Sequence, residues 1–412
     1  MIYKYSFQSW HDLEPEDQEK PRNPTSVCTS SSSASDFLTP SIKHEISNRS
    51  PHIVYISSIH ISHPFLSTLD FWLLVVSYIS YILLLSYLPT SKYPVVMTRI
   101  ILSTGNVILG GPSIIRKPGT YRSNFEFTNS LRTNFIAAQQ DYAAALPNGN
   151  GYAQTNGNGH NGRPVPEIWT AKEEDALYVP RIDWGLAGLQ EDRAQYEITL
   201  KLFFLPTAPL EKRENYINEA LRLVTKELGI SDVDLLIVSF PGISFEGECE
   251  FEADRRNSTM GDDDEEAATW VLLEKLHKQG QIGRLGVAEF GTEKLRRLLD
   301  KVKVRPAVDQ INIKNCCNVP PPLTKLAKSE NIELLTHHDS TDILPSGTLR
   351  ELLGQGPQGA GVLADEGVNG DSHGIKGEIT PEWVVKYTAF VKDRGVIENK
   401  GYFAGAKLAD EA

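Results

Sequence analysis

The sequence predicts an α/β protein built from parallel strand–helix units. Apolar strands and amphipathic helices alternate roughly every 25–30 residues along the C-terminal three quarters of the chain. Residues 234–240 form an apolar run that predicts a buried strand. Residues 212–228 carry Ile217, Leu221, Val224 and Leu228 on one helical face, and Gly229 marks the stop. Such alternation implies right-handed βα crossovers, and therefore either a barrel or a doubly wound sheet.

The other elements follow in order from Met97. A strand-turn-strand is expected at 97–108, a flexible insertion with Asn-Gly repeats at 147–166, and a strand at 196–204. The acidic stretch 246–266 is expected to be a solvated loop whose last carboxylates favour the start of the next helix. Further strands are expected at 284–287, 308–313 and 333–336, further helices at 268–279, 295–302, 323–329 and 381–391, and a Gly-rich loop at 354–377.

The first 96 residues differ from the rest. The segment 21–35 is rich in Ser, Thr and Pro without an apolar period, which indicates disorder. The uncharged segment 71–88 is long enough to span a membrane. Two interpretations stay open: an N-terminal membrane anchor, or an over-extended gene model in which the working protein begins at Met97. The expected organisation is an extension at 1–96 and a globular domain at 97–412.

Charge and cysteine content argue against nucleic-acid binding, a disulfide framework and a metal site. A net charge of -12 without a basic stripe argues against nucleic-acid binding. The four cysteines form no CxxC pair and no disulfide framework, which fits a reducing, cytoplasmic environment. Adjacent Cys316 and Cys317 are spaced too closely for a zinc site, so no metal is expected.

Two segments resemble the aldo-keto reductase family. Residues 233–242 (VDLLIVSFPG) and 280–290 (GQIGRLGVAEF) are similar to the family's strand-to-turn and helix-to-strand signatures. The resemblance implies a (β/α)8 barrel of the TIM type with its chemistry at the C-terminal ends of the strands. Reductases of the family hold NADPH there and use an Asp, Tyr, Lys and His set, with Tyr as the proton donor.

Carried onto this chain, that set is broken. Lys201 occupies the position of the family's strand-borne Lys, but Ser239 replaces the His, and no motif supplies the Tyr. Glu289 lies where the family carries an amide that holds the nicotinamide, whereas Gln310 keeps one matching amide. The resemblance thus implies vestigial positions rather than an active site, and no cofactor is expected.

Segments in which the chain departs from the reductase pattern resemble the regulatory (modifier) subunits of glutamate–cysteine ligase. The strings 309–320 (DQINIKNCCNVP) and 333–339 (ELLTHHD) are similar to that family, as is 391–402 (VKDRGVIENKGY). The resemblance implies a non-catalytic barrel that binds the ligase's catalytic subunit as a heterodimer, improves its use of glutamate and weakens feedback inhibition by glutathione.

Two other functions remain as alternatives: an NADPH-dependent oxidoreductase with a relocated proton donor, and a membrane-tethered scaffold that uses residues 71–88. A membrane is a partner only if that segment is inserted. Cys249, Cys316 and Cys317 are candidate partner-contact or redox thiols.

Overall fold

The computed structural model describes residues 98–109, 122–144, 163–313, 318–337, 339–365 and 374–409. The extension at 1–96, its segment 71–88 and most of the insertion at 147–166 therefore stay predictions. No helix among the described residues is long and apolar enough to cross a membrane.

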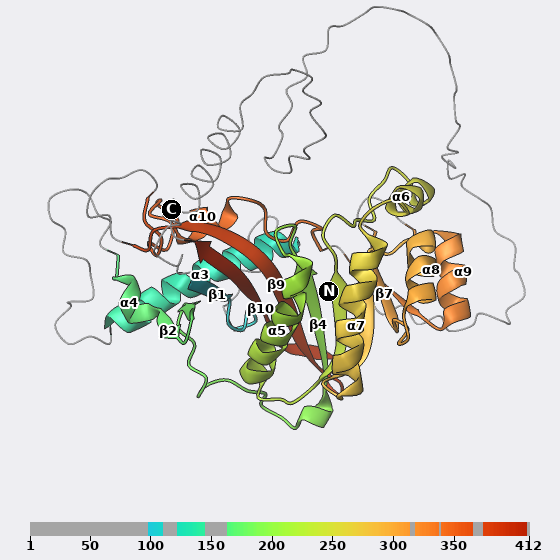
Figure 1. Ribbon diagram of the computed structural model, residues 1–412. Coiled ribbons are helices and arrows are strands. Elements are labelled where there is room, and N and C mark those ends of the chain that lie inside the picture. Colours follow the sequence, from blue (N-terminus) through green and yellow to red (C-terminus); the bar gives the residue numbers. More distant parts are fainter. Residues whose placement is uncertain are drawn as a thin grey trace, which may run out of the picture. The chain divides into compact units, whose positions relative to one another are not determined.

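One ten-stranded sheet organises the described residues (Figure 1). Its strand order is β2-β3-β1-β10-β9-β4-β5-β6-β7-β8. The run β4 to β8 is parallel throughout, and the long strands β9 and β10 form an antiparallel hairpin between β4 and β1. The strands are β1 Thr98–Ser103, β2 Ala171–Glu173, β3 Ala176–Val179, β4 Tyr196–Phe204, β5 Val233–Ser239, β6 Ile282–Ala288, β7 Val308–Asn312, β8 Glu333–His337, β9 Glu378–Val391 and β10 Val396–Ala409.

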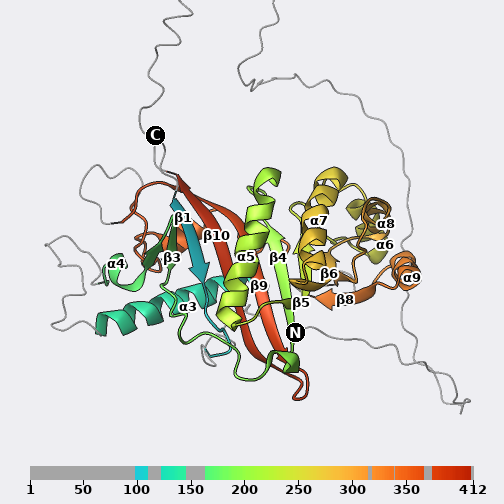
Figure 2. The same cartoon turned by 60° about the horizontal axis from the view of Figure 1, so that its bottom comes forward.

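Helices cover the two ends of the sheet differently. In both ribbon views α5, α7, α8 and α9 follow one another along the β4–β8 half, whereas α3 lies at the β1–β10 end (Figures 1 and 2). The remaining helices of the described part, α4, α6 and α10, are short. The helices are α3 Ser123–Ala144, α4 Pro166–Trp169, α5 Arg213–Leu228, α6 Glu250–Asn257, α7 Asp263–Lys278, α8 Thr292–Lys301, α9 Pro321–Glu330 and α10 Thr348–Leu353.

Two large apolar cores lie on opposite faces of the sheet. Val385 and Tyr387 of β9 belong to the core that packs on α5, α7 and α8. Their neighbour Val384 belongs to the core that contains side chains of α3 and α10. Because successive strand residues point to opposite faces, this alternation places the two cores on the two sides of β9.

The parallel half curves like the wall of a barrel. Strands β4 and β8 are separated by three others, which on a flat sheet would set them about 19 Å apart. Yet Asp339, two residues beyond β8, reaches Lys201 of β4 at 3.2 Å between Oδ2 and Nζ. The sheet therefore curls until the end of β8 faces the end of β4.

The expected elements of the βα repeat are confirmed. The predicted strand 196–204 is β4, and the helix at 212–228 is α5, which ends at Gly229 in the left-handed conformation (φ 65°). Asp262 caps α7 by accepting hydrogen bonds from the backbone N–H groups of Asp264 and Glu265. The acidic run thus occupies the positive end of the helix dipole, as expected.

Three expectations were wrong. Residues 381–391 were expected to be a helix, but they belong to strand β9. The acidic stretch 246–266 was expected to be a loop, but it contains α6 and the first turn of α7. After β1 the chain turns at 107–109 without a second strand within 97–108.

The helix prediction for residues 381–391 failed because Pro381 was taken as the first residue of a helix. Trp383, Val385, Tyr387 and Ala389 instead alternate with period two, and Trp, Val and Tyr favour strands. Packing of this face on the core decides for the strand.

Candidate functional site

The four predicted site positions meet at the C-terminal ends of adjacent parallel strands. Lys201 lies on β4, Ser239 ends β5, Glu289 follows β6 and Gln310 lies on β7. All four are buried. In the sheet register, Phe203 pairs with Ser239 and Ala288 pairs with Gln310. The strand ends thus bring these residues together as the barrel resemblance implies.

Lys201 is held by a carboxylate that bridges two halves of the sheet. Asp339 lies 3.2 Å from Lys201 Nζ through Oδ2 and 2.8 Å from Lys386 Nζ through Oδ1. Lys386 belongs to β9, the first strand of the hairpin. One buried carboxylate therefore joins β4, β9 and the segment after β8.

In the group formed by Lys201, Asp339 and Lys386, burial and the neighbouring charges shift each pKa in opposite directions. Burial alone would raise the pKa of Asp339, but Lys386, Lys201 and His337 outweigh it and hold the pKa well below its ordinary value. Burial also lowers the pKa of Lys201, although Asp339 opposes that shift. For Lys386, burial acts to lower the pKa and Asp339 outweighs it, so the pKa is raised.

His337 and Glu289 form a second contact beside this group. His337 Nδ1 accepts a hydrogen bond from the backbone N–H of Asp339 at 3.0 Å, so in the neutral ring the proton is assigned to Nε2. Nε2 lies 2.6 Å from Glu289 Oε1. The other carboxylate oxygen of Glu289 accepts from the backbone N–H of Phe245 at 3.0 Å. We call Lys201, Glu289, His337, Asp339 and Lys386 the strand-end cluster.

Glu289 adopts a conformation that L-residues rarely take. Its φ is 67°, in the left-handed region, and it is only 2% exposed. Asn257 of α6 holds the strained turn from outside, donating from Nδ2 to the Glu289 carbonyl at 2.6 Å and accepting from Gly291 N–H at 2.7 Å. Strain of this kind persists only where its surroundings over-determine it.

Two further buried atoms at the strand ends lack a hydrogen-bond partner among the described residues. They are Asp309 Oδ2 and Gln310 Oε1. Burial raises the pKa of Asp309 well above its ordinary value. The side-chain oxygen of Gln310 is an orphaned acceptor in the position that resembles a cofactor amide contact.

The hairpin contributes a third ionic contact. Lys400 Nζ lies 2.5 Å from Glu126 Oε1, and Tyr402 donates its hydroxyl to Glu126 Oε2 at 3.1 Å. Burial raises the pKa of Tyr402 well above its ordinary value. A tyrosine that acts as a general acid needs a pKa brought toward neutrality, so this shift has the wrong direction for that role.

A small cavity opens at the strand ends. Its volume is about 210 Å³, below the roughly 300–1,000 Å³ typical of sites for drug-sized ligands. Asn312 and Asp339 connect it to the strand-end cluster. The described lining residues are Arg122, Asn124, Glu246, Asn312, Asp339, Ser340, Thr341, Asp342 and Pro345.

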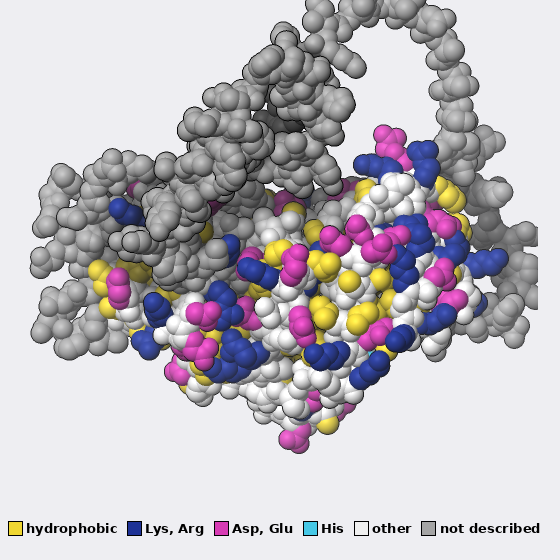
Figure 3. All heavy atoms as spheres, in the orientation of Figure 1, with side chains coloured by type: hydrophobic (Ala, Val, Ile, Leu, Met, Phe, Trp, Pro, Cys, Tyr) yellow, Lys and Arg dark blue, Asp and Glu magenta, His cyan; other side chains and the backbone are white. Residues whose placement is uncertain are grey.

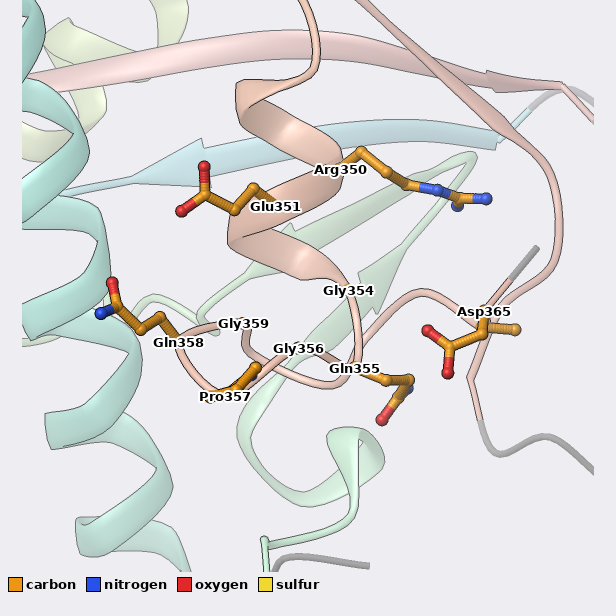
Figure 4. A pocket seen from close by; sticks show the side chains of 10 residues that line it. Arg350, Glu351, Gly354, Gln355, Gly356, Pro357, Gln358, Gly359 and Asp365 are labelled. Carbon is orange, nitrogen blue, oxygen red and sulfur yellow. The ribbon is translucent and has the colours of Figure 1, made fainter.

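A second cavity, of about 500 Å³, lies along α10 and the turn that follows it. Figure 4 shows Arg350 and Glu351 pointing to opposite sides of the helix rather than toward one point. Arg350 donates to the carbonyl of Gly377 at 3.2 Å. Polar groups that do not converge make this cavity a weaker candidate site than the strand ends.

Of the three candidate thiols, the structure describes Cys249. Cys249 occupies the N-cap position of α6 and is half-buried. Cys316 and Cys317 lie outside the described residues, as does His338. Among the described residues, no group of three or more His, Cys, Asp or Glu side chains could hold a metal ion.

Sequence reasoning missed Asp339 and Lys386 as members of the site. Asp339 stands in the string 333–339, but nothing in a single sequence indicates that it reaches back to β4. Lys386 was hidden by the helix prediction for 381–391. Recognising the period-two pattern there would have placed it on a strand beside Lys201, with which it pairs in register.

Comparison with known proteins places this geometry in a family. Residues 184–356 match the model of the aldo/keto reductase family. A putative glutamate–cysteine ligase regulatory subunit of Schizosaccharomyces pombe is 31% identical over 229 residues, which cover 53% of this chain and 72% of that protein. The chain belongs to the family of glutamate–cysteine ligase regulatory subunits.

Two more distant proteins are also similar to this chain. The human glutamate–cysteine ligase regulatory subunit is 27% identical over 217 residues, covering 53% of this chain and 68% of that protein. A solved aldo-keto reductase of the silkworm Bombyx mori is 26% identical with a TM-score of 0.23, covering 30% of this chain and 34% of that one. The fold is the α/β fold of aldo-keto reductases, with a barrel-like parallel half.

Proposed function

We propose that this chain binds the catalytic subunit of glutamate–cysteine ligase as a heterodimer, improves that subunit's use of glutamate and weakens its inhibition by glutathione. The observation that carries the proposal is the 31% identity to a putative regulatory subunit across 72% of that relative. Physically, a modifier of this kind acts by binding one conformational state of its partner more tightly than the other.

The geometry of the strand ends supports a non-catalytic role. Lys201 and Lys386 are both paired with Asp339, so one carboxylate compensates the two buried lysines of the cluster. The raised pKa of Tyr402 leaves that hydroxyl a poor proton donor. We propose that the cluster stabilises the barrel wall rather than carrying out chemistry.

The residues present fit NADPH poorly. Glu289 places a buried carboxylate at the position that resembles the nicotinamide contact, and both its oxygens are engaged by His337 and Phe245. We propose that the chain needs no cofactor, and that its working location is the cytoplasm.

Sedimentation velocity of a mixture with the purified catalytic subunit tests the heterodimer directly. We expect one faster-sedimenting species at a one-to-one ratio, with residues 97–412 sufficient to form it. Two species that sediment independently at micromolar concentrations would contradict the proposal.

The second candidate function, an NADPH-dependent oxidoreductase, is favoured by one observation, the orphaned oxygen of buried Gln310. Fluorescence titration with NADPH separates the two candidates. The regulatory proposal predicts no saturable signal for the native chain. Saturable binding that weakens in Gln310→Ala, but not in the matched exposed variant Gln358→Ala, would favour the oxidoreductase.

A further inference from the structure

The α6 segment carries a sequence that the proposed function does not use. Residues 255–258 read Arg-Arg-Asn-Ser, so two arginines precede Ser258 by three and two positions. In Figure 1, α6 stands at the edge of the described part, above α8. Figure 3 shows acidic and basic side chains interspersed on the face in view.

Both arginines are available to a partner. Arg255 and Arg256 are exposed, and none of the ion pairs among the described residues involves either guanidinium. Guanidinium groups bind carboxylates in a bidentate, geometrically specific manner. A protein whose acidic pockets read two successive arginines would therefore dock here without first breaking an ion pair.

The hydroxyl of Ser258 makes one local hydrogen bond. It is the C-cap residue of α6, half-buried, and its hydroxyl donates to the carbonyl of Arg255 at 2.7 Å. The helix has 8 residues, fewer than the roughly 12–15 needed for a helix to be stable on its own. Opening of this end would break the hydrogen bonds that Asn257 makes to Glu289 and Gly291 and the one that Arg297 donates to the Ser258 carbonyl.

We propose that Ser258 is a phosphorylation site for a basophilic protein kinase. In the transfer, Ser258 Oγ attacks the γ-phosphorus of ATP and forms the new O–P bond. The bond from that phosphorus to the β-phosphate oxygen breaks, ADP leaves, and the serine proton passes to the kinase's base.

The neighbouring Thr259 is a weaker acceptor despite its greater exposure. A kinase that reads acidic residues would recognise it through Asp262, three positions on. The carboxylate of Asp262 already accepts from the backbone N–H groups of Asp264 and Glu265. A kinase that bound Asp262 would have to break the N-cap hydrogen bonds of α7. A kinase that bound the two arginines would break no such contact.

A phosphate on Ser258 would act on the strained turn at Glu289. The group adds about -1.5 to -2 charges at a helix C-terminus, four residues before the acidic run, and both neighbours repel it. Arg297, which donates to the Ser258 carbonyl at 2.8 Å and contacts Asp263, is the cation at hand. Opening of α6 would withdraw Asn257 from the Glu289 carbonyl and from Gly291 N–H.

The test treats the full chain with Mg-ATP and the catalytic subunit of cyclic-AMP-dependent protein kinase, followed by residue-resolved mass spectrometry. We expect phosphate on Ser258, none there in Ser258→Ala, and an unchanged rate in Thr259→Ala. Arg255→Ala and Arg256→Ala should each slow transfer by about tenfold or more, whereas the matched exposed variant Arg296→Ala should not.

Two results would overturn the proposal. One is phosphate on Thr259 in place of Ser258. The other is an unmodified full chain under conditions in which a peptide of residues 250–264 is phosphorylated, because the site would then be closed in the folded protein. Hydrogen exchange tests the consequence: the Gly291 amide should exchange about tenfold faster after phosphorylation, and unchanged exchange would refute the link to Glu289.

Discussion

The parallel half of the sheet and the β9–β10 hairpin differ in how far apart in the chain their paired strands lie. From β4 to β8, each strand is followed by a helix or a turn, and contacts are made with neighbours in sequence. The hairpin instead inserts between β1 and β4, so its partners are about 200–300 residues away in the chain. The strand-end cluster joins the two, because Lys201 belongs to one region and Lys386 to the other.

This comparison shows how buried charged side chains can hold the two regions of the sheet together. Each lysine alone would be a buried charge, and Asp339 compensates both. The carboxylate therefore couples the register of the hairpin to the closure of the parallel half. Variants that remove this coupling, or that disturb one region alone, test the comparison.

The largest effect is expected from Asp339→Ala. The variant leaves Lys201 and Lys386 buried without a counter-charge, which should lower the free energy of unfolding by about 3–5 kcal/mol. Urea denaturation measures this change. The neighbouring exposed carboxylate provides the matched control, since Asp342→Ala should change stability by less than about 0.5 kcal/mol. Equal effects of the two variants would contradict the structural role of Asp339.

The pH dependence of the same carboxylate has a definite sign. The folded pKa of Asp339 is depressed, so its contribution to stability is present above the unfolded pKa of about 3.9 and is lost as pH falls through the folded value. The difference in stability between the native chain and Asp339→Ala should therefore shrink below about pH 4. A constant difference down to pH 2 would show that packing, not charge, is responsible.

A smaller effect, confined to the hairpin, is expected from Gly405→Ala. A Cβ atom at this position would lie 2.3 Å from Trp383 Nε1, and Trp383 is fully buried. Overpacking of this kind costs about 1–3 kcal/mol. The matched control is Gly356→Ala, where a Cβ meets nothing within 4 Å. Thermal unfolding followed by circular dichroism should separate the two variants, and equal midpoints would contradict the packing described for the hairpin.

The smallest effect is expected at Glu227, on the face of α5 near the hairpin. Burial raises the pKa of Glu227 to about 7. Because the folded pKa is raised, ionisation opposes folding, and stability is lost as pH rises from about 4.3 through 7. Glu227→Gln should stabilise the protein by about 1–2 kcal/mol at pH 8 and by nearly nothing at pH 4. A uniform gain at both pH values would contradict this assignment.

The two regions also differ in how far the sequence predicts them. The apolar faces of β4, α5 and β5 were readable because local period and local packing agree. The roles of Lys201, Ser239, Glu289 and Gln310 stay predictions. The period-two pattern of residues 381–391 indicates a strand, but Pro381 also permits a helix start, and the partner strand β4 lies far away in the chain. The contact between Asp339 and Lys386 was missed because it spans 47 residues.

Steady-state kinetics of the glutamate–cysteine ligase catalytic subunit, with and without residues 97–412, tests the central claim most directly. Glutathione would be titrated in both arms, with serum albumin at equal concentration as the control protein. Our account predicts a lower apparent KM for glutamate and weaker inhibition by glutathione when the chain is added. Identical kinetics in the presence of the folded chain would contradict it.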